Sequence, residues 1–376
     1  MPEIVLDSLQ KNFGSCSAAD GLSLKVKDGE YLCILGPTGS GKTTCLRMIC
    51  GLTKPDGGRV LFDGIDVTDV PVSERRATML SQVYSLFPSK TVYGNVMFSP
   101  QIKEWDEETS KQLVKSMIKM VHMEGKANAY PRELSGGQQQ RTALARALAS
   151  DSDILLLDEP LRALDARLRL ELRQELRSLV KEMGLTAIHV THDQDEALEM
   201  ADRIAVIRNG RIVQAGTPME VFQDPKTPFV ANFVGRSNIF TGKISSVCDD
   251  FTEVVLDNGT LIKARRTEIP EGTDVAVAVK IGSTRIPAIV SPTEEKPEPE
   301  TPHGFFRGRV ERILYEGATV TIEVDTKDAG LISSKLPNRR YDDYEIGDEV
   351  MVTWMPEKAN IFAISPREID EELRLD

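Results

Sequence analysis

Residues 34–44 read Ile34-Leu35-Gly36-Pro37-Thr38-Gly39-Ser40-Gly41-Lys42-Thr43-Thr44. An apolar run at residues 31–35 precedes the glycines and suits a buried strand, and apolar residues at helical spacing follow them. A glycine-rich turn at a helix N-terminus directs backbone N–H groups toward an anion. Lys42 supplies a charge for β- and γ-phosphates, and the Thr43 hydroxyl is a hard oxygen ligand for Mg²⁺. The stretch therefore predicts a phosphate-binding (Walker A) loop; the alternative is a glycine-rich turn with a chance lysine.

The bulk composition limits the class of protein. The chain has 376 residues, a net charge of −12 and five cysteines. This length predicts about two domains, and the acidic balance favours a soluble cytoplasmic protein over a non-specific nucleic-acid binder. We expect no signal peptide and no membrane span, so a role at a membrane requires separate membrane-crossing subunits. We expect reduced, buried thiols because no Cys-x-x-Cys pair occurs among Cys16, Cys33, Cys45, Cys50 and Cys248.

A second apolar run ends in two carboxylates, at Ile154-Leu155-Leu156-Leu157-Asp158-Glu159. A continuous apolar run is typical of a strand buried on both faces of a parallel sheet, and such sheets bind ligands at the carboxyl ends of their strands. We expect Asp158 to hold the Mg²⁺ shell and Glu159 to orient and deprotonate an attacking water. A solvated strand end is the alternative.

Two more polar residues are expected near that edge. A strand ending in Gln82 would place an amide oxygen beside the metal and the water. A strand at residues 186–191 precedes His192, whose ring can donate a hydrogen bond to a γ-phosphate. His189 falls inside that strand and is expected to be structural.

A second anion site is predicted at Leu134-Ser135-Gly136-Gly137-Gln138, which opens a helix. It has no lysine, so we do not expect it to hold a nucleotide alone. Another helix follows Asp165. Phe13, upstream of the phosphate loop, could stack on an adenine face, although spacing alone favours a core phenylalanine.

Further elements are predicted along the chain. Asp106 is expected to cap a helix, residues 195–201 to form a short helix, and residues 204–216 to form a hairpin with an Asn209-Gly210 turn. The region 84–98 is unusually apolar for a loop and indicates a partner surface, with a small satellite core as the alternative. Its apolar side chains are Tyr84, Leu86, Phe87, Tyr93 and Phe98.

The sequence changes character after about residue 236. Short alternating strands are expected at 251–256, 275–281, 310–314, 320–324 and 350–354. The acidic, proline-rich segment 293–300 is expected to be a mobile loop. This half resembles small β-barrels of the oligonucleotide-binding (OB) type, but sparse aromatics and the lack of a basic stripe argue against nucleic acid as a ligand.

Together these motifs resemble the full set of an ABC-transporter ATPase in order and spacing. The resemblance implies an α/β P-loop NTPase, with a RecA-like core and a helical subdomain at about 95–150, spanning residues 1–235. An all-β OB-like (TOBE-type) domain would follow at 236–376. It also implies a head-to-tail homodimer, in which each ATP with Mg²⁺ lies between the loop 36–44 of one copy and Ser135–Gln138 and Asp165 of the other. Phe13 then matches the family's adenine-stacking aromatic.

The C-terminal part of the chain, after residue 236, narrows the resemblance to one group of ABC-transporter ATPases. Residues 230–238, 347–350 and 354–357 resemble the C-terminal domain of importer ATPases of the polyamine, iron(III), sulfate and maltose group. This implies a subunit at the cytoplasmic face of the membrane with two transmembrane permease subunits, seated on region 84–98, and an extracytoplasmic solute-binding protein. Polyamine is the favoured solute.

Two alternatives to an importer remain at this stage. One is a soluble ABC ATPase acting on ribosomes or nucleic acid. The expected signs of that class are a second cassette, a long coiled-coil insertion or a basic arm, and the sequence has none of them. The other is an exporter ATPase, against which the long tail counts. The chain departs from the family pattern at Arg162, where a small polar residue is usual, and at Lys280-Ile281-Gly282-Ser283, which replaces Arg-Pro-Glu.

Overall fold

The structure is a computed structural model that describes residues 2–150, 152–287, 306–364 and 366–373. It divides into two compact units between Glu220 and Val221, fifteen residues before the boundary expected from the sequence. This point falls within helix α8 (Pro218–Gln223), and the next helix, α9 (Pro228–Phe233), packs on strands of the second unit. The acidic segment 293–300 lies outside the described residues.

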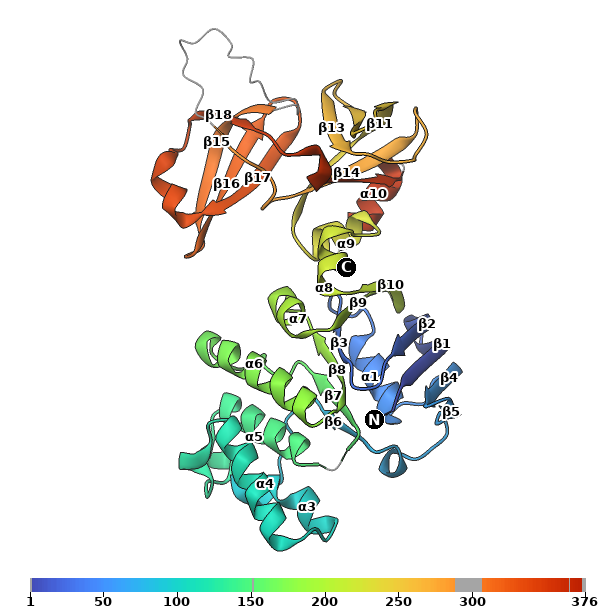
Figure 1. Ribbon diagram of the computed structural model, residues 1–376, viewed down its shortest axis with the longest axis vertical. Helices are drawn as coiled ribbons and strands as arrows, with labels where there is room; N and C mark the ends of the chain where they lie inside the picture. The colour runs from blue at the N-terminus through green and yellow to red at the C-terminus, as the bar shows by residue number, and fades with distance from the viewer. Residues whose placement is uncertain (1, 151, 288–305, 365, 374–376) are drawn as a thin grey trace. The chain divides into compact units, whose positions relative to one another are not determined.

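The first unit is built on a six-stranded sheet in the order β10-β9-β3-β8-β7-β6 (Figure 1). Neighbouring strands are parallel except for the antiparallel pair β9 and β10, which is the expected hairpin. The apolar runs at β3 and β7 are entirely buried, as strands covered on both faces require. The bounds are β3 Tyr31–Leu35, β6 Ala77–Leu80, β7 Ile154–Asp158, β8 Thr186–Thr191, β9 Arg203–Arg208 and β10 Arg211–Gly216.

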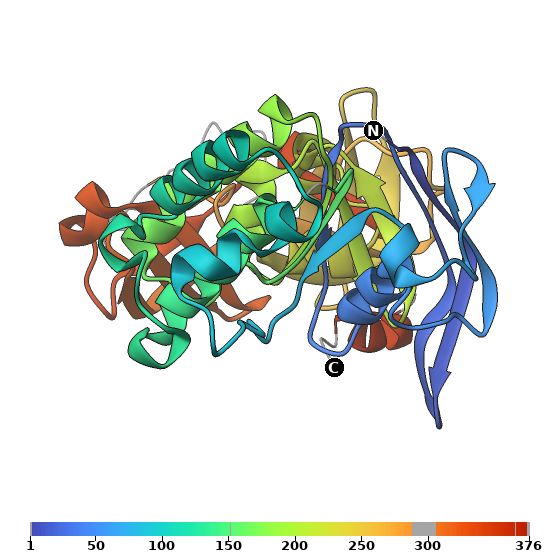
Figure 2. The same ribbon diagram turned by 90° about the horizontal axis from the view of Figure 1, so that it is seen from below.

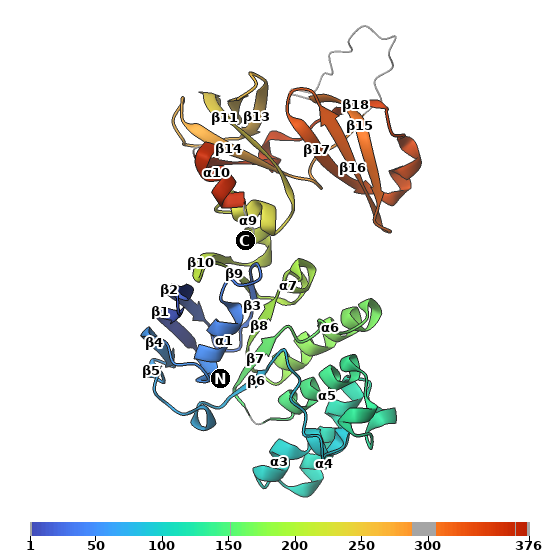
Figure 3. The ribbon, with the colours of Figure 1, turned by 180° about the vertical axis from the view of Figure 1, so that it is seen from behind.

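A smaller antiparallel sheet in the order β2-β1-β4-β5 completes the core of this unit. Helix α1 (Lys42–Cys50) lies between the two sheets (Figure 3), and one apolar cluster joins side chains of both sheets and the helix. This packing fixes the N-terminus of α1 at the carboxyl end of β3. The bounds are β1 Ile4–Phe13, β2 Cys16–Val26, β4 Gly57–Phe62 and β5 Ile65–Asp66.

The expected helical subdomain is present between residues 92 and 148. Figure 2 shows these helices, coloured cyan to green, on the side of the first unit opposite the dark-blue strands β1 and β2. Asp106 accepts from the Thr109 backbone N–H and caps α4, as predicted. The helices are α2 Val92–Val96, α3 Phe98–Ile102, α4 Glu107–Met120 and α5 Gly136–Leu148, followed in the sheet-bearing part by α6 Ala166–Glu182 and α7 Gln194–Met200.

The second unit contains two antiparallel sheets, in the orders β13-β12-β11-β14-β19 and β17-β16-β15-β18. Their inner faces share one apolar cluster, in which Phe240 and Phe306 stack beside Trp354. The strands predicted from alternation are all present within a few residues; the helix α10 (Pro366–Leu373) was not predicted. The bounds are β11 Ser237–Val247, β12 Phe251–Leu256, β13 Leu261–Arg265, β14 Asp274–Lys280, β15 Phe306–Tyr315, β16 Thr319–Thr326, β17 Gly330–Pro337, β18 Glu349–Val352 and β19 Ala359–Ala363.

The cysteines follow the prediction only in part. Cys33, Cys45 and Cys50 are buried reduced thiols, but Cys16 is exposed and Cys248 is half-buried. Cys16 begins β2 next to the turn at Gly14, where the end of the hairpin leaves its side chains in solvent.

Candidate nucleotide-binding and hydrolysis site

The loop between β3 and α1 has the backbone geometry of an anion cradle. Gly39 and Gly41 have φ of 82° and 102°, in the left-handed region that favours glycine. A Cβ at Gly41 would lie 2.0 Å from the Ala18 carbonyl oxygen, and one at Gly36 would lie 2.3 Å from the Ile207 carbonyl oxygen. Side chains at either position would force the loop away from the strands that support it.

Two polar side chains of the loop suit a phosphate ligand. The Ser40 hydroxyl is buried and has no hydrogen-bond partner among the described residues. Lys42 Nζ donates to the carbonyl oxygens of Gly36 (2.8 Å) and Pro37 (2.7 Å), so its ammonium lies across the loop. Burial lowers the pKa of Lys42, while the carboxylates of Glu159 and Asp158 oppose that shift. Thr38 at the loop apex is exposed, and Thr44 is half-buried in the first turn of α1.

The predicted metal ligands Thr43 and Asp158 are in contact. Thr43 Oγ1 donates to both carboxylate oxygens of Asp158, at 3.1 and 3.0 Å. Burial raises the pKa of Asp158, and the Thr43 hydrogen bond partly offsets that effect. A hydroxyl and a buried carboxylate at the end of a phosphate loop are the hard oxygen ligands that Mg²⁺ prefers, so these residues fit the ion.

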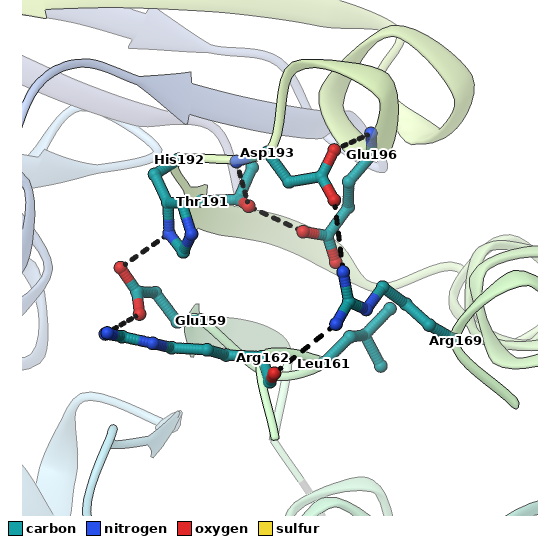
Figure 4. A pocket seen from close by; sticks show the side chains of 8 residues that line it. All are labelled: Glu159, Leu161, Arg162, Arg169, Thr191, His192, Asp193 and Glu196. Atoms are coloured by element: carbon teal, nitrogen blue, oxygen red, sulfur yellow. Dashed lines mark hydrogen bonds and ion pairs between the residues drawn. The ribbon is translucent and has the colours of Figure 1, made fainter. Parts of the chain in front are cut away.

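Glu159 lies one residue beyond β7 and is held by three side chains, two of which, Arg162 and His192, are drawn in Figure 4. Its Oε2 accepts from Arg162 at 2.7 Å and from the Gln82 amide nitrogen at 3.3 Å, and its Oε1 lies 3.1 Å from His192 Nδ1. The Glu159 backbone has φ of 52°, a conformation that side-chain-bearing residues adopt only when their surroundings impose it. Burial raises the pKa of this carboxyl, but the bonds from Arg162 and His192 outweigh burial and lower it.

The wall beside Glu159 is a connected set of polar side chains (Figure 4). The Thr191 hydroxyl donates to Glu196 at 2.5 Å and accepts from the backbone N–H of Asp193 at 3.0 Å. Asp193 Oδ2 pairs with Arg173 at 2.8 Å. This network fixes the segment after β8 and therefore the position of His192.

The position of Gln82 differs from the prediction in one respect. Strand β6 ends at Leu80, where its pairing with β7 stops, and Gln82 lies in the following loop. The Ser81 hydroxyl donates to the Val83 carbonyl oxygen at 2.6 Å and stabilises this turn. Gln82 still reaches the site, through its bond to Glu159 rather than from the end of a strand.

The segment Leu134–Gln138, which we call the signature segment, forms the predicted start of a helix, α5. Ser135 caps α5 in a reciprocal pair, in which the Ser135 N–H donates to Gln138 Oε1 at 2.9 Å and the Gln138 N–H donates to Ser135 Oγ at 3.4 Å. Ser135 and Gly136 are exposed, so this helix end faces solvent. Gly137 lies close to the Ala163 carbonyl oxygen, which a Cβ would approach to 3.0 Å.

Gln140 is a site residue that the sequence analysis did not single out. It is buried; its Nε2 donates to the Glu159 carbonyl oxygen at 3.0 Å and its Oε1 accepts from the Ala163 N–H at 2.9 Å. It thus joins the signature helix to the segment that carries Glu159. The sequence signal that could have identified Gln140 is its position one helical turn after Gly136, at the end of the run Gln138-Gln139-Gln140.

Two other predicted residues occupy exposed or helix-capping positions. Phe13, the last residue of β1, is 54% exposed, so the core interpretation of this side chain is wrong; Lys11 Nζ lies 5.6 Å from its ring centroid. Asp165 caps α6 by accepting from the Leu168 N–H at 3.0 Å. His189 is fully buried against the Tyr31 hydroxyl, as a structural histidine.

The apolar region 84–98 is only partly packed. Phe87 and Phe98 lie with ring centroids 4.2 Å apart, and Arg146 lies over the Phe87 ring at 5.2 Å. Asn95 is fully buried and accepts from the Phe87 N–H at 2.9 Å, which fixes the loop. The five apolar side chains that defined the region all remain half-buried, so they do not form a closed satellite core.

Two features are absent from the part of the chain that the structure describes. No group of three or more His, Cys, Asp or Glu side chains there is arranged to hold a metal ion. Within the same residues, no helix combines the length and apolar character needed to cross a membrane.

Comparison with known proteins gives consistent matches to both units. Residues 19–162 match the ABC transporter family, and residues 287–362 match the TOBE domain. A spermidine/putrescine import ATP-binding protein of Trichormus variabilis is 40% identical over 89% of this chain and 87% of that protein. The protein of the same name from Thermobifida fusca is 38% identical over 96% and 94%. A sulfate/thiosulfate import ATP-binding protein of Caulobacter vibrioides is 49% identical over 64% and 73%.

Among solved structures, a dimeric ATP-binding cassette in a post-hydrolysis state bound to ADP and phosphate is similar. It is 34% identical, with a TM-score of 0.53, and the match covers 57% of this chain and 98% of that one.

Proposed function

The chain belongs to the ATP-binding subunits of ABC transporters, and from that premise we propose that it hydrolyses ATP to drive solute import through separate membrane subunits. The observation that carries the proposal is the placement of Glu159. Its carboxylate is oriented by Gln82, Arg162 and His192, next in sequence to the Asp158 that contacts Thr43 of the phosphate loop.

Each side chain of the site has a role in hydrolysis. The N–H groups of the loop 36–44 and the Lys42 ammonium bind the β- and γ-phosphates and offset the charge that develops during reaction. Glu159 accepts a proton from the attacking water, for which its lowered pKa keeps it ionised at neutral pH. His192 and Gln82 hold that carboxylate from two sides. Phe13, exposed at the end of β1, is available to stack on the adenine ring.

Mg²⁺ is the proposed cofactor, with Thr43 and Asp158 as its protein ligands and Gln82 close to Glu159 as a third candidate. When bound, the ion would neutralise charge on the phosphate oxygens. The donor set of a hydroxyl, a carboxylate and an amide oxygen matches its preference.

We propose that two copies pair head to tail. In a single chain the exposed Ser135 and Gly136 present the N-terminus of α5 to solvent, with no cation of its own in the Ser135–Gln138 segment. A second copy would place this helix end, with Gly137, Gln138 and Asp165, against the phosphates bound by the first copy. The similar solved cassette is itself described as a dimer bound to ADP and phosphate.

The proposed assembly contains two transmembrane permease subunits and, outside the membrane, a solute-binding protein. The half-buried aromatic region 84–98 is the proposed seat of the permeases, at the cytoplasmic face of the membrane. A polyamine is the proposed solute, because relatives that match nearly the whole chain are named for spermidine and putrescine. The sulfate-named relative matches a shorter part.

The decisive experiment replaces the proposed base. Glu159→Gln keeps the shape of the side chain and removes its basicity, so we expect kcat for ATP hydrolysis to fall about 10²- to 10⁴-fold while ATP remains bound. The matched control is Glu182→Gln, an exposed residue at the end of α6, which should keep the normal rate. Normal turnover by Glu159→Gln would remove Glu159 from this role.

The partners are tested by recovering the tagged intact chain from native membranes. Two membrane subunits should co-purify, and radiolabelled spermidine uptake should stop when the chain is deleted. Recovery of ribosomal proteins or nucleic acid instead would favour the non-transport alternative, and loss of efflux rather than uptake would favour an exporter.

A further inference from the structure

The second unit contains a recess that hydrolysis does not use. It is lined by residues 222–224, by the last residues of β13 and β14, and by the 3-10 helix Pro356–Lys358. The strands β13 and β14 belong to one sheet (Figure 1), so the recess opens where several of its elements end. Its volume is about 720 Å³ including the open mouth, enough for a small molecule.

Lys280 is the unusual residue of this recess. It is the last residue of β14, pairs with Ser237 of β11 through the backbone, and is only 8% exposed. Its Nζ is buried and has no hydrogen-bond partner among the described residues. An ammonium offers three N–H donors, and leaving all of them unpaired inside a protein is costly. The position therefore calls for an acceptor that is not part of the described chain.

The surroundings hold the ammonium in place without neutralising it. Its nitrogen lies 4.2 Å from the centroid of the Phe222 ring, a cation–π contact. A Cβ added to Gly235 would come within 2.5 Å of Nζ, so a side chain at residue 235 would shift the ammonium. Burial lowers the pKa of Lys280 from 10.5 to about 8, and no carboxylate among the described residues counters that shift.

The charged side chains of the recess other than Lys280 cancel one another. Arg265 is paired with Asp224, while Lys358 and Glu357 are exposed at the rim. The paired and rim charges balance, which leaves the Lys280 ammonium as the net charge of the site. Ser283 and Asn360 add a hydroxyl and an amide that can donate to an oxygen ligand.

We propose that this recess binds a small oxyanion, with Lys280 Nζ as its central contact and the hydroxyl of Ser283 and amide of Asn360 as supporting donors. Carboxylate, phosphate and sulfate share the required chemistry, which is a negative oxygen that accepts from an ammonium at the back of an open recess. A cationic solute does not fit, because the buried group it would meet carries the same charge. The site lies outside the hydrolytic machinery and offers the importer a place to sense an anionic metabolite.

The test is calorimetric titration of the full-length protein with sodium phosphate, sodium sulfate and sodium citrate in separate arms, at constant ionic strength set with sodium chloride. The variant is Lys280→Met, which keeps most of the stem and removes the charge. The matched control is Lys263→Met, since Lys263 also lies over a phenylalanine ring, that of Phe251 at 4.1 Å, but outside the recess. Anion binding at the phosphate loop is common to all three proteins and cancels in the comparison.

We expect the wild type and Lys263→Met to share one binding event, with at least one anion, that is weakened about tenfold or more in Lys280→Met. The titration in which this binding event occurs identifies the anion as phosphate, sulfate or carboxylate. A second variant, Gly235→Ala, keeps the charge but displaces the ammonium, and should weaken the same event. Identical titrations of wild type and Lys280→Met in every arm, or an equal response to chloride, would overturn the proposal.

Discussion

Arg162 donates to Glu159 Oε2 at 2.7 Å, so this arginine contacts the proposed catalytic base directly. The Arg162 side chain is 56% exposed, whereas that of Glu159 is 14% exposed. The two residues are three apart, and the left-handed backbone of Glu159 turns its carboxylate toward the arginine. Arg162 therefore adjusts the basicity of Glu159 as well as its orientation.

The first prediction concerns the pH dependence of hydrolysis. Arg162→Gln removes a hydrogen bond and a positive charge that lower the pKa of Glu159, and leaves the burial that raises it. The base must be ionised to act, so a raised pKa moves the acid limb of the pH–rate profile to higher pH. The measurement is kcat against pH for the wild type and Arg162→Gln.

The control for this experiment is Arg167→Gln, which breaks another short arginine–glutamate pair, with Glu171, on the exposed face of α6. Its acid limb should coincide with that of the wild type. If Arg162→Gln also leaves the acid limb in place, the arginine does not act on the carboxyl of Glu159.

Local spacing was sufficient to predict the phosphate loop and the two acids at the end of β7, Asp158 and Glu159. In both cases the decisive residues are adjacent to the strand that positions them, so periodicity and motif identify them together. Ser135 and Asp165 were also predicted as helix starts from sequence, because a helix cap depends on residues three apart.

Features that depend on contacts across the fold could not be predicted in this way. Gln140 meets Glu159 and Ala163, about twenty residues later, only because α5 packs beside the loop after β7. The unit boundary lies near residue 220 because the short helix α9 packs on β14. The isolation of Lys280 requires knowing that no acceptor surrounds it in the described structure.

The second prediction tests the cradle of the phosphate loop. Gly41→Ala places a Cβ 2.0 Å from the Ala18 carbonyl oxygen, which is a collision. The φ of 102° at this residue adds backbone strain for any residue with a side chain. The loop must move, so we expect ATP affinity to fall by about 10²-fold or more, equivalent to roughly 3 kcal/mol or more. The measurement is equilibrium binding of a fluorescent ATP analogue.

The control variant Gly14→Ala distinguishes the effect of backbone strain from the effect of a collision between the added Cβ and a neighbouring atom. Gly14 has φ of 61° and nothing within 4 Å of its added Cβ, so the substitution costs only about 1–2 kcal/mol of stability from backbone strain. ATP affinity should be unchanged in that variant. Equal affinity losses in both variants would show that strain, rather than closeness to Ala18, governs the loop.

The third prediction concerns the link made by Gln140. Gln140→Leu leaves the Glu159 carbonyl and the Ala163 N–H without their partner in a buried position, which costs about 1–3 kcal/mol per group. We expect a lower melting temperature and a reduced kcat with nearly unchanged ATP affinity, because the phosphate loop is not altered.

The comparison for Gln140 is Gln112→Leu on the exposed face of α4, whose amide donates to Glu108 Oε1 at 3.2 Å. Both the melting temperature and kcat should match the wild type there. A Gln140→Leu protein with normal kcat would mean that the helix α5 and the Glu159 segment are positioned independently of this amide.

The last prediction uses the lowered pKa of Lys280. The unfolded chain releases this proton near pH 10.5 and the folded chain near pH 8, so between these values the unfolded state binds more protons. The free energy of unfolding of the second unit should therefore rise as pH increases from about 8 to about 10.5, by up to roughly 3 kcal/mol. Trp354 reports on that unit in denaturant titrations of the full chain once Trp105 is replaced by Phe, since the chain has two tryptophans.

Lys280→Met, in the same Trp105→Phe background, should lose this rise and should be more stable than its parent at pH 7, where the parent buries an unpaired ammonium. A bound oxyanion pairs with the ammonium and restores its pKa, so saturating anion should flatten the pH dependence of the parent as well. A rise with pH of equal size in both proteins would assign it to other groups and leave Lys280 ordinarily solvated. The flattening by anion connects this stability measurement to the binding experiment, because both depend on the same unpaired nitrogen.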